Sequence, residues 1–317
     1  MKTLFIKNNT RDYISKIYWS LQKGLALKTD LVSFGKNQDF YDESATRYQD
    51  IIDTCYGKGF PDLVIADFDY AKLKFNYEDW GVLPRTIKRV MLLGDYWAIP
   101  NRLEFIDIVK RNFDFVLTFF YESIKMYPEL GGKLIFCPPS IDPDIFRDWE
   151  LNTQYEVGFL GSGCNTLKRT YPERFRITNL LKNVYGDAFY TDEHPGWGFF
   201  DSSHNIVGEG FSKAINKCKI FLTTSGTIGH CNPKYYEIMA SGSLLFGNPC
   251  NYLSKYHIEN LFNCIIFKSD KDLLNSLQKY LKHTSLRQNI INKGLDTIRR
   301  YHTGAKRAET LLGRINL

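Results

Sequence analysis

Residues 232–247, NPKYYEIMASGSLLFG, predict a short helix that runs directly into a buried strand. Asn232 is a good N-cap, and Pro233 suits the first helical position. The small residues at 240–242 suit a helix C-terminus, and the apolar run after them suits a strand that is covered on both faces. A helix followed by such a strand is half of a βαβ unit, so this stretch indicates an α/β protein.

Two charged residues of this stretch, Lys234 and Glu237, are three positions apart and therefore share one face of the predicted helix. The spacing by itself fits a surface ion pair as well as a functional site. A lysine in the first turn has the wrong sign for the helix dipole, which makes sense if an anion such as phosphate binds beside it. Glu237 could accept hydrogen bonds from a vicinal diol such as ribose.

The alternation of helices and apolar strands continues on both sides of this stretch. Strands are predicted at 1–6, 30–35, 61–68, 89–97, 113–120, 133–139, 243–249 and 263–269, and a strand with the turn that follows it is predicted at 155–163 and again at 218–226. Helices are predicted from the spacing of Tyr13, Ile17, Leu21 and Leu25, and at 48–55, 173–184, 270–281 and 286–317. Strands joined by helices favour right-handed βαβ units and doubly wound parallel sheets.

A stretch rich in proline and aspartate, PPSIDPDIFRDWE at 138–150, interrupts the alternation. Such a break is typical of a connection between domains. The chain of 317 residues also exceeds the usual size of a single core. We therefore predict an N-terminal Rossmann-like domain at 1–150 and a C-terminal Rossmann-like domain at 151–317.

The composition is that of an ordinary globular protein with a modest positive charge. The formal net charge of +6 favours an anionic partner, but Lys and Arg are dispersed among acidic residues rather than clustered. A nucleic-acid partner is therefore allowed but not favoured. The seven scattered cysteines indicate reduced thiols, and no segment has the length of a membrane span. We expect a cytoplasmic protein, with peripheral contact to the inner face of a membrane allowed.

Ligands of open α/β sheets bind beyond the carboxyl ends of the strands, so the loops at these ends hold the candidate residues. After the strand at 155–160 come Gly161 and Ser162, whose backbone could approach phosphate, and then the basic residues Lys168, Arg169 and Arg174. After the strand at 218–224 come Ser225 and Gly226. On the predicted helix, Tyr235 and Gly242 complete the candidate set for the ligand.

Several motifs together resemble the glycosyltransferases of the GT-B fold, in particular group 1 transferases related to CgeB-like proteins. Lys234, Glu237, Ala240 and Gly242 match their K-x-x-E-x-x-A-x-G signature, which an apolar strand follows. PPSIDPDIF resembles their interdomain segment, VGFLGS with the later YPER resembles the opening of their second domain, and YHTGAKR carries an H-T-x-x-x-R pattern. The resemblance extends from about residue 138 to the end of the chain.

This resemblance implies two Rossmann-like domains that face a cleft, and transfer of a sugar from a nucleoside diphosphate donor such as a UDP-sugar or GDP-sugar. It implies that Glu237 binds the donor ribose, that Lys234 and Arg174 lie near the diphosphate, and that Gly161 and Ser162 form the turn on the donor side. No metal ligand set is evident in the sequence, and the resemblance implies a metal-independent hexosyltransferase. A surface glycan, a lipid-linked sugar or another glycoconjugate is the favoured acceptor.

One departure from the pattern concerns the chemistry. Many retaining enzymes of this class carry a second glutamate eight residues before the position of Glu237, where this chain has Gly229. An inverting enzyme would need a base that faces the acceptor. Asp95, directly after the strand that starts at Arg89, is the first candidate, followed by His204 and His230. A transferase acting on modified DNA bases and a non-catalytic nucleotide-sugar-binding protein stay open as alternatives.

Overall fold

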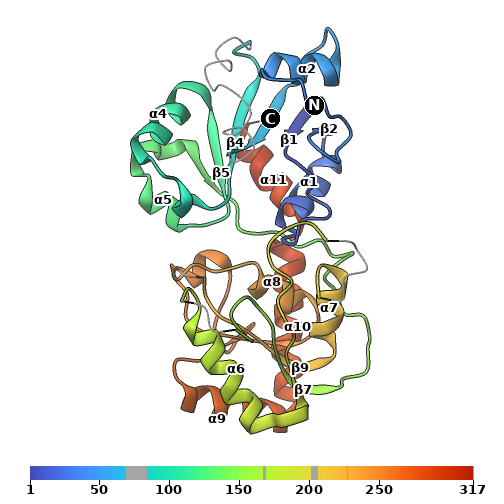
Figure 1. Cartoon of the computed structure of the whole chain (residues 1–317), viewed down its shortest axis with the longest axis vertical. Coiled ribbons are helices and arrows are strands. Elements are labelled where there is room, and N and C mark those ends of the chain that lie inside the picture. Colours follow the sequence, from blue (N-terminus) through green and yellow to red (C-terminus); the bar gives the residue numbers. More distant parts are fainter. Residues whose placement is uncertain (69–83, 167–168, 201–205, 227, 317) are drawn as a thin grey trace. The chain divides into compact units, whose positions relative to one another are not determined.

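The computed structural model describes residues 1–68, 84–166, 169–200, 206–226 and 228–316 of the chain. These residues form two compact units (Figure 1). The first unit contains Met1–Arg11, Tyr18–Pro138 and Gly304–Leu317, and the second contains Asp12–Ile17 and Pro139–Thr303. The predicted domain limit at residue 150 stays a prediction. Among the described residues, no helix has the length and apolar character needed to span a membrane.

The first unit is built on a six-stranded parallel sheet with the strand order β2-β1-β3-β4-β5-β6. The strands are β1 (Lys2–Ile6), β2 (Asp30–Phe34), β3 (Leu63–Asp67), β4 (Lys88–Leu93), β5 (Phe115–Thr118) and β6 (Leu134–Phe136). All five residues of β3 are buried, which explains its continuous apolar sequence. The six strands predicted in this half of the chain are confirmed.

The helices of the first unit are α1 (Ile17–Ala26), α2 (Tyr48–Tyr56), α4 (Arg102–Asn112), α5 (Glu122–Met126) and α11 (Gly304–Ile315). Short 3-10 turns lie at Tyr96–Ala98 and Pro128–Lys133. The C-terminal helix α11 packs against α1 at backbone distance, because a Cβ on Gly24 would lie 2.1 Å from the Gly304 carbonyl oxygen. The first unit thus uses the C-terminal end of the chain as one of its covering helices.

Two helix predictions need correction. The predicted helical pattern began at Tyr13, but α1 begins at Ile17, and the residues before it group with the second unit. The predicted helix from 286 to the C-terminus is two helices, α10 (Thr284–Tyr301) and α11, with a break at His302 and Thr303. The His302 carbonyl accepts a hydrogen bond from Ile141 N at 2.7 Å, so the connector fixes this break.

The second unit is built on a five-stranded parallel sheet with the strand order β11-β10-β9-β7-β8. The strands are β7 (Tyr155–Phe159), β8 (Phe189–Tyr190), β9 (Cys218–Thr223), β10 (Leu244–Gly247) and β11 (Ile265–Ile266). The remaining helices are α6 (Pro172–Tyr185), α7 (Glu209–Asn216), α8 (Lys234–Ala240) and α9 (Asp270–Lys282). Short 3-10 turns lie at Gly186–Ala188 and Leu253–Tyr256.

Side chains alternate between the two faces of the second sheet. Val157, Ile220 and Leu244 belong to a core cluster that also contains apolar residues of α6, α9 and α10. Phe221, which points to the opposite face, packs edge-on against Phe211 of α7 with ring centroids 5.8 Å apart. Helices therefore cover both faces, as a doubly wound sheet requires. The predicted α/β class with two Rossmann-like parallel sheets is confirmed.

The strand orders locate one switch point in each sheet. In the second sheet the chain moves from β7 outward to β8 and then returns to place β9 on the other side of β7. In the first sheet β1 has the same position, with β2 on one side and β3 on the other. Because connections leave a switch point in opposite directions, a crevice forms beyond the carboxyl ends of these strands. The residues that follow β7, β9, β1 and β3 are therefore the candidates for contact with a ligand.

Candidate nucleotide-binding site

Two cationic side chains meet the loop that follows β7. Lys234, the first residue of α8, donates from Nζ to the Leu160 carbonyl oxygen at 2.9 Å. Arg174, in the first turn of α6, donates from Nη1 to the Ser162 carbonyl oxygen at 3.1 Å. These two bonds flank Gly161, so residues far apart in the sequence converge at the carboxyl end of β7.

Arg174 also connects this loop to the end of β9. Its Nε donates to Thr224 Oγ1 at 2.8 Å, and its guanidinium carbon lies 3.9 Å from the centre of the Tyr171 ring. The side chain is fixed by a bond on each side and by an aromatic face beneath it. Arg174 is therefore a rigid, buried cation at the switch point of the second sheet.

Gly161 allows both cations to approach the backbone. A Cβ at this position would lie 2.9 Å from Lys234 Nζ and 3.5 Å from Arg174 Nη1. Burial, with a further contribution from the nearby Arg174, lowers the pKa of Lys234 to about 8. Both side chains donate to neutral oxygens, and in the described part of the chain neither forms an ion pair with a carboxylate. The arrangement can hold an anion in the same place.

Glu237 lies one turn after Lys234 on α8 and is 7% exposed. Burial raises the pKa of its carboxyl to about 7, and the ammonium groups of Lys234 and Lys16 oppose this rise. No hydrogen bond joins the Glu237 side chain to another group within the described ranges. Since a buried carboxylate normally has partners, this acceptor is available to hydroxyl groups of a ligand.

The start of α8 is organised by Asn232. The helix begins at Lys234, one position later than predicted, but Asn232 Oδ1 accepts a hydrogen bond from Lys234 N at 3.0 Å. Asn232 Nδ2 also donates to the Thr224 carbonyl. The residue at the N-cap position of α8 is Pro233 rather than the predicted Asn232, and Asn232 holds the start of the helix against the loop that follows β9 through these two side-chain bonds.

Ser225 and Gly226 continue the loop after β9 and are held by neighbouring residues. Ser225 N donates to Asn248 Oδ1 at 2.6 Å, and Tyr235 OH donates to the Asn248 carbonyl at 2.6 Å. Tyr235 is fully buried, so it fixes Asn248 rather than pointing into open space. A Cβ on Gly226 would lie 2.0 Å from the His230 ring, so only glycine lets the imidazole lie there.

His230 is buried beside this loop. Burial, with Arg174 as a second cause, lowers the pKa of His230 to about 4. The imidazole is therefore neutral near pH 7, and it adds no positive charge to the pair formed by Arg174 and Lys234.

Other predicted residues are not brought to this cluster. Arg169 is exposed in a turn before α6. Gly242 lies past the opposite end of α8, where its φ of +81° suits glycine and where it packs against Asp148. Lys168 and His204 fall outside the described residues.

Asp95 belongs to the first unit. It directly follows β4 and Gly94, is exposed, and its carbonyl accepts from Ala98 N at 2.8 Å at the start of a 3-10 turn. Its role as a base stays a prediction.

Thr224, Asn248 and Tyr171 support the cluster but were absent from the predicted set. Thr224 and Asn248 are polar residues that directly follow buried strands, and this position was the available signal for both. Tyr171 precedes Arg174 by three residues at the entrance to α6.

The switch point of the first unit also holds a cation, but a carboxylate neutralises it. Lys7 Nζ, just after β1, lies 2.7 Å from Asp67 Oδ2 at the end of β3. The Lys7 ammonium also lies 3.9 Å from the centre of the Tyr18 ring. The Asp67 side chain is 4% exposed and the Lys7 side chain is 15% exposed, so this ion pair is partly buried.

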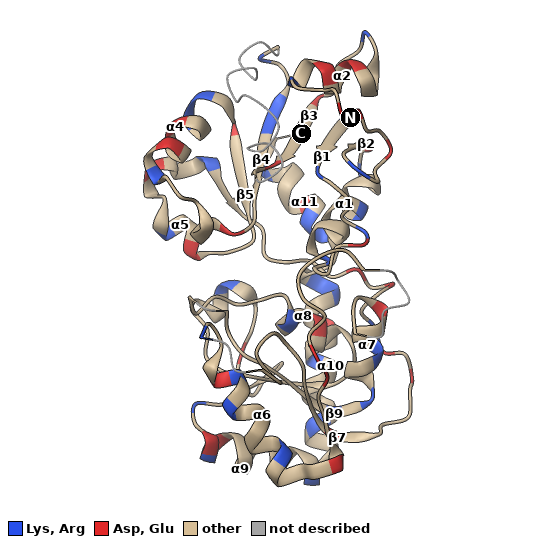
Figure 2. Cartoon of the chain, viewed as in Figure 1, with Lys and Arg blue, Asp and Glu red and all other residues tan. Residues whose placement is uncertain are grey.

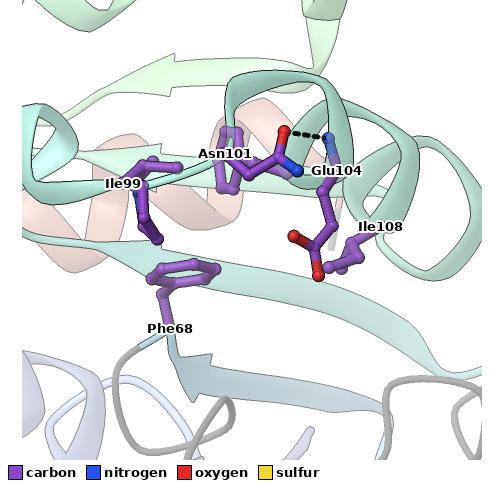
Figure 3. Close-up of a pocket in the computed structure, with 7 residues that line it drawn as sticks. Phe68, Ile99, Asn101, Glu104 and Ile108 are labelled. Atoms are coloured by element: carbon purple, nitrogen blue, oxygen red, sulfur yellow. Dashed lines mark hydrogen bonds between the residues drawn. The ribbon is translucent and has the colours of Figure 1, made fainter.

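The first unit has a small pocket between Phe68, the residue after Asp67, and α4 (Figure 3). Ile99, Asn101, Glu104 and Ile108 line it, and Asn101 Oδ1 accepts from Glu104 N at 3.2 Å. Its volume of about 40 Å³ leaves room for a few water molecules rather than a sugar.

Figure 2 shows Lys and Arg interspersed with Asp and Glu along the ribbons of both units. The local excess of positive charge around Gly161 is therefore a feature of one site and not of a broad basic surface. Within the described ranges, no group of three or more His, Cys, Asp or Glu residues could hold a metal ion.

The arrangement of the two parallel sheets is also found in solved structures of other proteins, and this similarity concerns the fold. Anabaena HepE, solved with UDP and glucose, has a TM-score of 0.66 at 9% identity, over 100% of this chain and 99% of HepE. Sucrose-phosphate synthase from Thermosynechococcus elongatus has a TM-score of 0.63 at 10% identity, over 100% and 98%. An alpha-glucosyltransferase solved with UDP and a 13-mer DNA has a TM-score of 0.65 at 9% identity, over 100% and 99%.

The family comparison agrees with the fold. Residues 166–313 match the family model described as glycosyl transferase-like. No curated protein sequence matches the chain. The chain therefore has the GT-B fold that the sequence motifs predicted, and its residues 166–313 are similar to the glycosyl transferase-like family, while the CgeB-like subfamily stays a prediction.

Proposed function

We propose that the chain is a glycosyltransferase that takes its sugar from a UDP-sugar bound by the second unit. The observation that carries this proposal is the convergence of Arg174 and Lys234 on Gly161, where both side chains donate to neutral oxygens and neither pairs with a carboxylate of the described residues. A diphosphate supplies the missing negative charge, and a guanidinium fixed by Thr224 and Ser162 is suited to a phosphate contact. Further support comes from neighbours of the same fold that were solved with UDP or UDP-glucose.

The roles of the individual residues follow from their chemistry. Arg174 and Lys234 contact the diphosphate, and the backbone at Gly161 and Ser162 lies beside it. Glu237 accepts hydrogen bonds from the two ribose hydroxyls. Ser225 and Gly226 border the same crevice, with Tyr235 and Asn248 holding their loop in place.

In the transfer step, the bond between the anomeric carbon of a hexose and the β-phosphate oxygen breaks, and a bond to an acceptor oxygen forms. Negative charge develops on the leaving diphosphate. Arg174 and Lys234 can stabilise that charge from fixed positions, so the step would not require a metal ion. For an inverting reaction, Asp95 is the candidate base for the acceptor.

Calorimetry with UDP, GDP and ADP tests the donor assignment. We expect UDP to bind, and we expect release of UDP from UDP-glucose or a related UDP-hexose once a suitable acceptor is present. No binding of any of the three nucleotides would contradict the proposal. Binding of UDP without turnover of any sugar in a panel of UDP-sugars would instead favour a non-catalytic nucleotide-sugar-binding protein.

A glycan or other glycoconjugate is the acceptor that we favour, because charges of both signs are mixed along the chain. The structural neighbour solved with a 13-mer DNA supports a second candidate, a modified base in DNA. An affinity for duplex DNA that falls steeply with rising salt would favour the second candidate.

A further inference from the structure

The last residue of the K-x-x-E-x-x-A-x-G signature lies against a segment from outside the nucleotide-binding loops. Gly242 follows α8, and a Cβ there would lie 3.1 Å from Asp148 Cγ. This tight spacing and the φ of +81° both favour glycine at the position. The segment Arg147–Glu150, which ends the proline- and aspartate-rich stretch, therefore lies at the C-terminal end of the helix whose first turn contains Lys234 and Glu237.

Asn216, the last residue of α7, joins this segment to α8. Its side-chain Nδ2 donates to the Arg147 carbonyl at 3.0 Å and to the Ser241 carbonyl, and its Oδ1 accepts from Trp149 N at 2.8 Å. Ser241 directly follows α8, and its own N–H donates to the Glu237 carbonyl at 3.2 Å. One side chain thus holds the segment and the end of α8 together.

Ser212, one turn earlier on α7, makes a second connection. Its Oγ lies 2.9 Å from Ser241 Oγ and accepts from Trp149 Nε1 at 3.0 Å, so α7 and α8 lie side by side (Figure 1). Ser212 and Ser241 are fully buried, and Asn216 is 9% exposed. The side-chain oxygens and nitrogen of all three residues form hydrogen bonds. A buried polar network that is satisfied in this way specifies one arrangement of the elements it joins.

The position of α8 matters for the candidate site because Lys234 depends on short distances. Its Nζ is 2.9 Å from the Leu160 carbonyl oxygen, and a Cβ on Gly161 would lie equally close to it. The helix has seven residues and is therefore about 10 Å long, too short to absorb a shift by gentle bending. A displacement of its C-terminal end should therefore also move its first turn.

We propose that Asn216 and Ser212 are positioning residues of the donor site, because they fix the C-terminal end of α8 and thereby place its two charged residues for the nucleotide. Asn232 holds the other end of the helix against the loop that follows β9, so α8 is anchored at both ends. This role rests on the proposed function, because it concerns the same donor site.

The test is calorimetric titration of UDP into the full chain and its Asn216→Ala variant, which loses the bonds to the segment and to the Ser241 carbonyl. We expect the Kd for UDP to rise roughly tenfold, less than the hundredfold that a misplacement of about 1 Å can cause. The stoichiometry of the titration reports the folded fraction. A loss of stability alone would therefore lower the stoichiometry and leave the Kd unchanged.

A double-mutant cycle connects the effect to α8. In a Lys234→Met background the ammonium that the network places is absent, so Asn216→Ala should raise the Kd only about threefold. An effect unrelated to the placement of Lys234 would be the same in both backgrounds. Ser241→Ala removes only the bond between the two hydroxyl groups and should raise the Kd about twofold.

Asn263→Ala is the matched control, because Asn263 is also a buried asparagine of the second unit. It is 3% exposed, and its Nδ2 donates to the His257 carbonyl at 2.8 Å and to Thr297 Oγ1 at 3.1 Å. These partners lie outside α8. The variant should lower the free energy of unfolding, as Asn216→Ala does, but leave the Kd for UDP unchanged.

Three results would overturn the positioning role. These are an unchanged Kd in Asn216→Ala, an equal rise of the Kd in Asn263→Ala, and a full rise that persists in the Lys234→Met background. Ser212→Ala gives the same readouts if Asn216→Ala does not fold, because it removes the other connection to Ser241. Failure of the unaltered chain to bind UDP would overturn the proposed function itself, and is distinguished from the other results because it needs no variant.

Discussion

The two parallel sheets place a cation at the same topological position, beyond the carboxyl end of the strand at the switch point. In the first unit Lys7 Nζ is 2.7 Å from Asp67 Oδ2, and the pair is partly buried. In the second unit Arg174 and Lys234 donate to carbonyl and hydroxyl oxygens. The first position is neutral as it stands, whereas the second carries a positive charge that a bound anion would balance. A common fold thus gives two switch points, and the charge at each distinguishes a structural ion pair from a ligand site.

The largest effect is expected from Asp67→Asn, which leaves the partly buried Lys7 without its carboxylate. Breaking one side of such a pair should lower the free energy of unfolding by about 3 kcal/mol. Urea denaturation followed by circular dichroism measures this change. The Kd for UDP should stay the same, since the pair belongs to the first unit. Weaker UDP binding with an unchanged free energy of unfolding would mean that the Lys7–Asp67 pair serves ligand binding and not stability, which contradicts the comparison between the two switch points.

Lys234→Met should weaken UDP binding roughly a hundredfold, because it removes a desolvated charge from the proposed diphosphate contact. Calorimetry at constant pH and salt measures the loss. Lys219→Met is a suitable control, since Lys219 and Glu156 form an ion pair on neighbouring strands of the same sheet and both side chains are partly exposed. A loss below threefold would mean that Lys234 serves only to hold the Leu160 carbonyl.

Glu237→Gln should weaken UDP binding about tenfold at pH 8, since it removes a charged acceptor from two ribose hydroxyls. The pH dependence provides a second readout. In the unaltered chain, affinity should fall below about pH 7 as Glu237 is protonated, and above about pH 8 as Lys234 loses its proton. Glu237→Gln should remove only the fall on the acidic side. A variant that keeps both falls would exclude Glu237 as their cause.

The smallest effect is expected from Gly161→Ala. The new Cβ would lie 2.9 Å from Lys234 Nζ, so the ammonium must shift by a few tenths of an ångström. We expect UDP affinity to fall roughly fivefold, well under the hundredfold that a displacement of about 1 Å can cause. Calorimetry measures this fall, and Gly132→Ala is the control, because a Cβ there meets no atom within 4 Å. Equal UDP affinities in the two variants would show that diphosphate binding does not depend on the close approach of Lys234 to Gly161.

Much of the fold could be predicted from the sequence because buried parallel strands have a continuous apolar character. The segment Leu63–Asp67 is an example, with every residue buried. The break between α10 and α11 was not predictable in this way. It depends on a bond between His302 and Ile141, which are distant in the sequence, and helical periodicity continues across it.

The candidate site was partly predictable because several of its residues have recognisable positions in the sequence. Gly161, Arg174, Lys234 and Glu237 follow strand ends or begin helices, so local patterns point to them. Thr224 acts through a hydrogen bond to Arg174, which is 50 residues away in the sequence, and a linear pattern does not register such a contact. The roles of the four predicted residues in binding stay predictions until the variants are measured.

The most direct test of the central claim compares UDP with uridine, which lacks the diphosphate, in the unaltered chain and in Lys234→Met. If Arg174 and Lys234 hold the diphosphate, the unaltered chain should bind UDP at least a hundredfold more tightly than uridine, an advantage of about 2.7 kcal/mol. Lys234→Met should lose most of that advantage while its affinity for uridine stays the same. An unchanged ratio of the two affinities in Lys234→Met would contradict the claim that this switch point is the site of the diphosphate.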